Sequence, residues 1–191
     1  MEENKDLETK EKKGFFAEVL EFLKIIILAA AIVLPIRYFI AQPFIVRGAS
    51  MEPTYENSEY LLIDEVTYYF RAPERGEVVV FRYPQNPSQF FIKRIIALPG
   101  ETIEINDGKI QVAKGGQKEE IILDEPYLSR DVKTIGDTTL TLNENEYFVL
   151  GDNRQASSDS RFWGPLLKKF LVGRAFFRAW PITKFGVVTG L

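Results

Sequence analysis

The stretch FIVRGASMEPT, residues 44–54, presents a single serine on a bend bounded by glycine and proline. Gly48 can adopt backbone conformations that other residues resist, and Pro53 restricts both itself and Glu52 before it. A stiff bend of this kind can hold the Ser50 hydroxyl exposed and leave a backbone N–H free to stabilise an oxyanion. The alternative is a plain turn, because Ser, Gly and Pro are common turn residues.

The chain has no histidine and no cysteine. These absences exclude disulfides, a cysteine nucleophile, a Cys/His zinc site and a Ser-His-Asp triad. A serine nucleophile must then find another base, and a neutral lysine can serve as one. A free lysine titrates near about pH 10.4, so a lysine base must lie in an apolar stretch, where loss of water lowers its pKa.

Lys93 meets this requirement, because it lies in FFIKRIIAL, residues 90–98. If this segment is a strand, Lys93 shares a face with Phe91 and Ile95, and Arg94 points the opposite way. The alternative is a solvent-facing lysine on a half-buried strand. Other lysines lie in polar runs: Lys10, Lys12, Lys13, Lys114, Lys118 and Lys133.

A third chemical segment, GDNRQASSDSR at residues 151–161, follows a strand-like EYFVL. A long solvated loop is one interpretation. A braced loop that holds a site rigidly is the other. Its charged side chains alternate in sign closely enough to brace one another: Asp152, Arg154, Asp159 and Arg161. Its serines are candidates to orient the lysine amine by a hydrogen bond: Ser157, Ser158 and Ser160.

Length and charge limit the class of protein. With 191 residues, the chain has room for one domain, or for one domain with a small satellite and an anchor. Apolar residues make up 46% and aromatic residues 13%, enough for a real core. The net charge of −3 argues against a nucleic-acid partner, which requires a cationic face.

The N-terminal region divides into a charged part and an apolar part. We predict a solvated cytoplasmic tail at residues 1–18 and a membrane anchor helix at 19–43, in which twelve uncharged residues lie between Lys24 and Arg37. A cleaved secretory signal and a buried amphipathic helix are the alternatives. Basic residues precede the apolar segment, which favours a single pass with the bulk of the chain outside the cell membrane.

From residue 44 onward, β-rich runs follow one another every 8 to 15 residues and are separated by turn residues, such as NDG at 106–108. This spacing predicts a mostly β fold with an antiparallel, barrel-like sheet. We assign residues 44–104 and 143–191 to the catalytic core. Residues 105–142, richer in charge and glycine, are predicted to form a small inserted β subdomain.

Four segments in order, GASMEPT, GEVVVFRYP, FFIKRIIALPGE and GDNRQASSDSRFWG, resemble the sequence boxes of bacterial type I signal peptidases. The resemblance extends from the apolar segment to about FGVV near the C-terminus and omits mainly residues 105–142. It implies Ser50 as the nucleophile and Lys93 as the general base. It also implies Ser157 as the hydroxyl that orients Lys93, with the Ser50 N–H as the oxyanion hole.

The same resemblance implies two structural ion pairs, Arg94 with Asp152 and Asp159 with Arg161. It places the lining of shallow pockets for small side chains at five positions: Phe44, Val46, Leu61, Val80 and Ile92. In some members of that family a hydroxyl two residues before the nucleophile completes the oxyanion hole. Here that position is Gly48, so backbone and water are expected to act there. Glu101 stands where an Asp is usual.

The implied reaction is hydrolysis of one peptide bond in secreted preproteins, after an Ala-x-Ala-like sequence, at the outer face of the membrane. No cofactor and no metal are expected, and the partners are preproteins and membrane lipid. Exposed aromatic residues near the anchor, such as Phe44 and either Trp163 or Trp180, are candidates to enter the lipid interface, and burial in the core is the favoured alternative for each Trp. The alternatives are a LexA-like Ser-Lys autoprotease and a non-catalytic, membrane-anchored β domain for binding.

Overall fold

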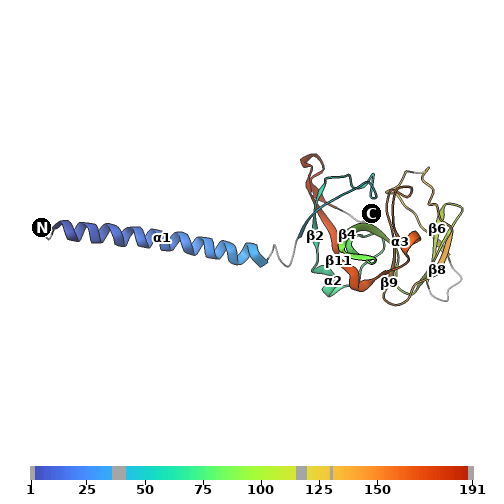
Figure 1. Ribbon diagram of the computed structural model, residues 1–191, viewed down its shortest axis with the longest axis horizontal. Coiled ribbons are helices and arrows are strands. Elements are labelled where there is room, and N and C mark those ends of the chain that lie inside the picture. Colours follow the sequence, from blue (N-terminus) through green and yellow to red (C-terminus); the bar gives the residue numbers. More distant parts are fainter. Residues whose placement is uncertain (1–2, 36–41, 115–119, 130, 189–191) are drawn as a thin grey trace. The chain divides into compact units, whose positions relative to one another are not determined.

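A computed structural model describes residues 3–35, 42–114, 120–129 and 131–188. Residues 1–40 and 41–191 form two separate compact units. The first contains one continuous helix, α1 (Glu3–Pro35), shown in blue in Figure 1. Among the helices in the described ranges, none is both long enough and apolar enough to cross a membrane.

The predicted boundary between tail and anchor at residue 18 is not an end of a helix. Helix α1 runs through both the charged tail and the start of the apolar segment. The charged tail is rich in Glu and Lys, which are good helix formers. The predicted tail is therefore helical from Glu3. The part of the predicted anchor at 36–41 lies outside the described residues. The last two residues of the predicted anchor, Gln42 and Pro43, are the first two residues of strand β1.

The second unit is mostly antiparallel β, as predicted. Its larger sheet has the order β1-β2-β11-β3-β4-β9-β10, and β12 pairs with β11. Every pairing in this sheet is antiparallel. The strands are β1 (Gln42–Ile45), β2 (Tyr60–Asp64), β3 (Val78–Tyr83), β4 (Asn86–Ala97), β9 (Glu146–Leu150), β10 (Leu166–Leu167), β11 (Leu171–Trp180) and β12 (Gly186–Val187).

Strand β11 was not predicted, although it is ten residues long and lies between β2 and β3. Its sequence, LVGRAFFRAW, has no clean alternation, and its pairings with β2 and β3 contain irregularities in register. At Gly173 a Cβ would lie 2.5 Å from the Asp64 carbonyl oxygen of β2, so a residue without a side chain is required there. The helical pieces of this unit are short: α2 (Thr67–Phe70), α3 (Ser160–Trp163) and two 3₁₀ turns, Lys168–Phe170 and Ile182–Lys184.

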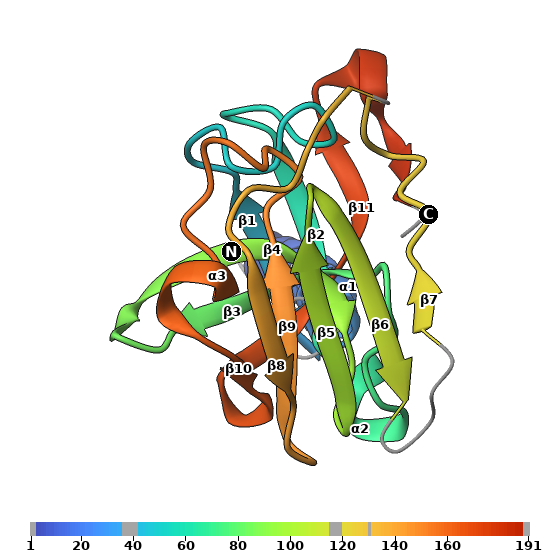
Figure 2. The ribbon, with the colours of Figure 1, turned by 90° about the vertical axis from the view of Figure 1, so that its right-hand side faces the viewer.

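The inserted segment forms a second, four-stranded sheet with the order β7-β6-β5-β8 (Figure 2). It starts at Glu101, four residues before the predicted boundary at 105, because the turn at Leu98–Glu101 already leads out of β4. The predicted hairpin turn joins β5 to β6, with Asp107 and Gly108 at positive φ. The strands are β5 (Glu101–Asn106), β6 (Lys109–Lys114), β7 (Glu120–Ile122) and β8 (Thr138–Thr141).

The two sheets share one hydrophobic core, so the inserted segment is packed onto the main sheet and is not a separate satellite. Ile103 and Ile105 of β5 are buried in the same cluster as Ile96 of β4 and Phe148 of β9. Two further clusters lie within the larger sheet. This sheet curls so that its edge strand β1 approaches β4, and the rings of Phe44 and Phe90 meet edge to face at 5.3 Å.

Candidate active site

Ser50 lies on the bend that follows β1, and several contacts fix this bend. Gly48 has a φ of +90°, a region that favours glycine, and its N–H donates to Asn57 Oδ1 at 2.9 Å. After Ser50, the side chain of Met51 is completely buried and anchors the bend in the core. From the opposite side, the backbone N–H of Asn153 donates to the Ser50 carbonyl oxygen at 3.1 Å. The bend is therefore held from both sides.

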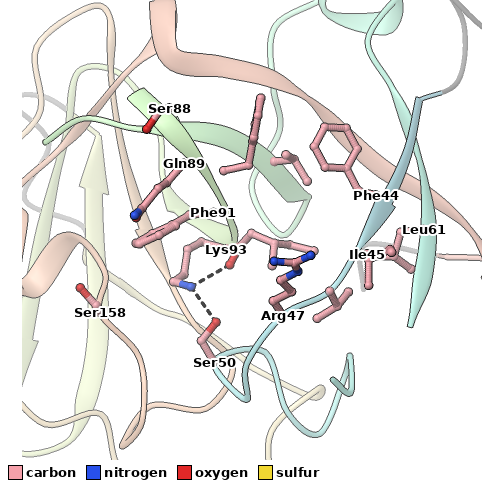
Figure 3. Close-up of a pocket in the computed structure, with 14 residues that line it drawn as sticks. Phe44, Ile45, Arg47, Ser50, Leu61, Ser88, Gln89, Phe91, Lys93 and Ser158 are labelled. Atoms are coloured by element: carbon pink, nitrogen blue, oxygen red, sulfur yellow. Dashed lines mark hydrogen bonds between the residues drawn. The ribbon is translucent and has the colours of Figure 1, made fainter. Parts of the chain in front are cut away.

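Lys93 reaches Ser50 from β4, although 43 positions separate the two in sequence. Lys93 Nζ lies 2.7 Å from Ser50 Oγ and donates to the Ile92 carbonyl oxygen at 2.8 Å (Figure 3). The residue is 3% exposed. The sequence predicted a lysine in apolar surroundings, and the structure brings that lysine to the serine hydroxyl.

Burial controls the protonation of this amine. It lowers the pKa of Lys93 from its ordinary 10.5 to about 8, while the carboxylates of Asp159 and Asp152 act in the opposite direction. At pH 7 roughly a tenth of such an amine is neutral, compared with far less than a thousandth of a free lysine. A neutral amine can accept a proton from the serine hydroxyl, and an ammonium cannot.

Ser157 does not make the hydrogen bond to Lys93 that the resemblance implies. Its hydroxyl is buried and has no hydrogen-bond partner in the described part of the chain. The hydroxyl is turned toward Gly151, where an added Cβ would lie only 2.2 Å from Ser157 Oγ and 2.4 Å from the Ser50 carbonyl oxygen. Glycine at position 151 therefore lets the two segments approach each other.

The first expected ion pair joins Arg94 of β4 to Asp152. Arg94 Nε and Nη2 donate to the two carboxylate oxygens at 2.9 and 2.7 Å, and both side chains are almost fully buried. Thr54, four residues after Ser50, donates through Oγ1 to the same carboxylate at 2.6 Å. Asp152 therefore connects β4, which carries Lys93, to the end of the Ser50 bend.

The second expected ion pair, Asp159 with Arg161, forms within the loop. Both nitrogen-to-oxygen distances are 2.8 Å, and Asp159 also accepts the N–H of Gly151 at 3.1 Å. The expectation that the four charged side chains of this loop would brace one another holds only for this pair. Asp152 pairs with Arg94, and Arg154 pairs outside the loop, because each is held by a partner from a distant segment.

A groove of about 630 Å³ runs past Ser50 and Lys93 (Figure 3). One wall is β1 and the segment after it, and the other is the first half of β4. All five side chains predicted to form the pockets line this groove: Phe44, Val46, Leu61, Val80 and Ile92. No cluster of three or more acidic side chains suited to a metal ion occurs within the described ranges.

Sequence reasoning missed two residues of the site, Asn153 and Arg47. Asn153 donates through Nδ2 to the Ala49 carbonyl oxygen at 3.1 Å, and the only signal for it was its place beside Asp152. Arg47 and Ser158 both line the groove. Arg47 had a readable signal, a single cation in an apolar and small run, whereas Ser158 is one of the three serines of the loop predicted as candidates to orient the lysine.

Known proteins resemble this chain over most of its length. Residues 19–180 match the family model described as signal peptidase, peptidase S26. A probable signal peptidase I-2 from Synechocystis is 37% identical over 99% of this chain and 87% of its own. Signal peptidase IB of Staphylococcus aureus is 31% identical, over 88% and 93% respectively. A crystal structure of a signal peptidase I from Enterococcus faecalis is 32% identical, covers 55% of this chain and 97% of its own, and gives a TM-score of 0.46.

Proposed function

Because the chain belongs to the signal peptidase family, peptidase S26, and is a serine endopeptidase that removes signal peptides, we propose that Ser50 is its nucleophile and Lys93 its general base. The observation that carries this assignment is the 2.7 Å contact between Ser50 Oγ and a buried amine whose pKa is lowered to about 8. The chain has no histidine that could act in place of the lysine.

In the proposed mechanism, neutral Lys93 accepts the proton of the Ser50 hydroxyl while the oxygen attacks the carbonyl carbon of the cleaved bond. The resulting ammonium gives its proton to the leaving amine, and an acyl group remains on Ser50. A water molecule, deprotonated by the same amine, then releases the signal peptide with a new carboxylate. As the ester bond breaks, the ammonium returns this proton to Ser50 Oγ, so that Lys93 is neutral again, and burial favours this neutral form.

The oxyanion formed during attack needs a hydrogen-bond donor, and we assign this role to the Ser50 N–H. This N–H has no acceptor in the described part of the chain, whereas the Gly48 N–H is already used by Asn57. Preorganised backbone donors of this kind stabilise the transition state strongly. The ion pairs of Asp152 and Asp159 support the site by fixing the segments that carry it.

We place the substrate, an extended segment of a secreted preprotein, along the groove. On the groove side, the edge of β1 is not paired with another described strand, and β4 pairs with β9 only from Arg94 onward. An extended peptide can therefore add its backbone hydrogen bonds between these two edges. The apolar side chains beneath it leave room for small residues, so large residues are excluded sterically.

We also propose that the protein works at a membrane. In α1 the side chains from Ile25 to Leu34 carry no charge, and many of them are half or more exposed. In the second unit, a surface patch of exposed apolar side chains surrounds the end of β11: Trp180, Ile182, Phe185 and Val187. Such surfaces favour lipid contact. The basic residues before the apolar segment favour an N-terminus in the cytoplasm and residues 41–191 outside.

Membrane placement can be tested with right-side-out vesicles that carry the full chain. The protein should float with the vesicles at high salt, and a protease added outside should digest residues 41–191. Recovery of the chain in the soluble fraction would contradict the membrane assignment. Protection of residues 41–191 from the protease would indicate the opposite orientation, with these residues inside the vesicle.

The catalytic assignment can be tested with a synthetic peptide that contains an Ala-x-Ala site, incubated with the full chain in detergent. Cleavage should occur after the second Ala, and both Ser50→Ala and Lys93→Met should abolish it. Ser129→Ala and Lys109→Met are matched controls at exposed positions and should leave the rate unchanged. Residual cleavage by Lys93→Met above background would exclude the lysine base. An intact peptide with the wild type would favour the non-catalytic β domain.

A further inference from the structure

The groove contains a cation that the proposed chemistry does not use. Arg47 lies three residues before the nucleophile, is exposed and lines the groove. Figure 3 shows its guanidinium directed into the groove, with Ser50 and Lys93 on one side and Leu61 on the other. No carboxylate pairs with Arg47 in the described part of the chain. Its charge therefore does not serve the fold.

The surroundings of Arg47 give the groove a local charge. The described residues that line it include two cationic side chains, Arg47 and Lys93, and no Asp or Glu. When Lys93 is neutral, as the proposed base must be, Arg47 carries the positive charge of the groove. A substrate side chain of negative charge is attracted by it, and one of positive charge is repelled.

The position of the guanidinium selects one substrate residue. In an extended peptide, successive side chains point to opposite faces and advance by about 3.3 Å per residue. With the cleaved carbonyl at Ser50, the two small side chains enter the apolar floor, and the residue between them points toward the mouth of the groove. This middle residue is next to the one whose carbonyl meets Ser50 and points to the exposed side of the groove, and Arg47, three positions before Ser50, is the exposed cation of the groove lining.

Resting on the proposed function, we infer that Arg47 is a specificity-determining residue that favours substrates with an acidic side chain between the two small residues before the cleaved bond. The preferred sites are then of the form Ala-Glu-Ala or Ala-Asp-Ala. Sites with Lys or Arg at the middle position are disfavoured. The contact is an ion pair at a partly open surface, so its effect on rate is moderate and depends on salt.

The test compares kcat/KM for peptides that differ only at the middle position, Glu, Gln or Lys, with the full chain in detergent. For the wild type at low salt we expect the order Glu, Gln, Lys, with about a tenfold ratio between Glu and Lys. Arg47→Gln should bring this ratio close to one, and Arg47→Glu should invert it. The matched control Lys109→Glu makes the same charge change on β6, away from the groove, and should keep the wild-type ratio.

Two further series of kcat/KM measurements test whether the effect is electrostatic and at which substrate residue it acts. Raising the salt concentration should shrink the wild-type ratio toward one, because an exposed ion pair is screened. Placing the same charges on the first residue after the cleaved bond should give a much smaller ratio than at the middle position. A larger ratio there, an equal rate for all three middle residues, or a ratio unchanged in Arg47→Gln would overturn the inference. Failure of the wild type to cleave even the Gln peptide would instead overturn the proposed function on which it rests.

Discussion

At the scale of single residues, the proposed mechanism depends on the protonation of Lys93. The amine is held by Ser50 Oγ and the Ile92 carbonyl oxygen, and burial makes its charged form unfavourable. The two nearby carboxylates, Asp152 and Asp159, limit this effect but are themselves engaged by arginines. The result is an amine that is ready to accept a proton in mildly alkaline solution.

The pH dependence of activity follows directly. We expect kcat/KM for a neutral peptide to rise with pH and to level off above an apparent pKa of about 8, because only the neutral amine accepts the proton. The measurement is a pH–rate profile between pH 6 and 10 at constant ionic strength. A profile that is flat across this range would show that Lys93 is not the base.

The same burial predicts an effect on stability. Below pH 8 the amine is charged in both the folded and the unfolded chain, so the folded chain bears the full cost of burying that charge. This cost disappears between pH 8 and 10.5. In that range Lys93 is already neutral in the folded chain and is still charged in the unfolded chain. Relative to Lys93→Met, the wild type should gain roughly 2 kcal/mol in free energy of unfolding between pH 7 and pH 10.

Urea denaturation of the two proteins at both pH values measures this difference. Comparing the wild type with Lys93→Met cancels the contributions of all other titrating groups. A difference that does not change with pH would mean that the amine is solvated in the folded chain.

At the scale of elements, the loop that starts at Gly151 touches the Ser50 bend. The two can approach each other because Gly151 has no side chain. A Cβ there would lie 2.4 Å from the Ser50 carbonyl oxygen and 2.5 Å from Ser157 Cβ. Neither atom can move away freely, because the Ser50 carbonyl is bonded to the Asn153 N–H and Ser157 is buried. The loop and the bend therefore share one fixed geometry.

Substitution of Gly151 by Ala should displace the Ser50 bend and reduce kcat at least 100-fold, since small misplacement of reacting groups costs about that much. KM should change far less, because the groove floor is formed by other strands. Gln155→Ala, an exposed position in the same loop, is the control and should have wild-type kinetics. Near-normal kcat in Gly151→Ala would show that the bend can relax.

At the scale of the whole second unit, the inserted sheet and the catalytic loop are joined by a buried ion pair. Arg154 of the loop forms two hydrogen bonds with Glu125 of the segment after β7, and it also contacts Thr134 and the Gly151 carbonyl oxygen. The side chain of Arg154 has no exposed surface. The inserted segment thus acts as a support for the loop that fixes Ser50.

Removal of the carboxylate in Glu125→Ala should lower the free energy of unfolding by roughly 2 to 3 kcal/mol, because a buried guanidinium loses its partner. Replacement of both partners, Glu125→Leu with Arg154→Met, should recover most of this loss. Urea denaturation of the three proteins measures it. Glu56→Ala, which breaks an exposed pair with Lys184, should have no measurable effect. Equal stability of Glu125→Ala and the wild type would exclude the supporting role.

The sequence alone indicated the proposed chemistry of the site. A chain without histidine or cysteine makes lysine a candidate base for a serine, and Lys93 lies in an apolar run of the kind that lowers its pKa. Local alternation and turn residues likewise predicted the strands from β2 to β9 and the turn at 107–108. These features depend on the types and spacing of neighbouring residues, which a sequence displays directly.

Only the tertiary structure decided which distant groups meet. The 2.7 Å contact between Lys93 and Ser50 depends on the curl of a sheet in which an inner strand, β11, follows both residues in the chain by more than 70 positions. The partner of Arg154 lies 29 positions away, in a segment whose local pattern shows no sign of it. Pairings of this kind are set by packing and burial across the whole fold, and no local pattern encodes them.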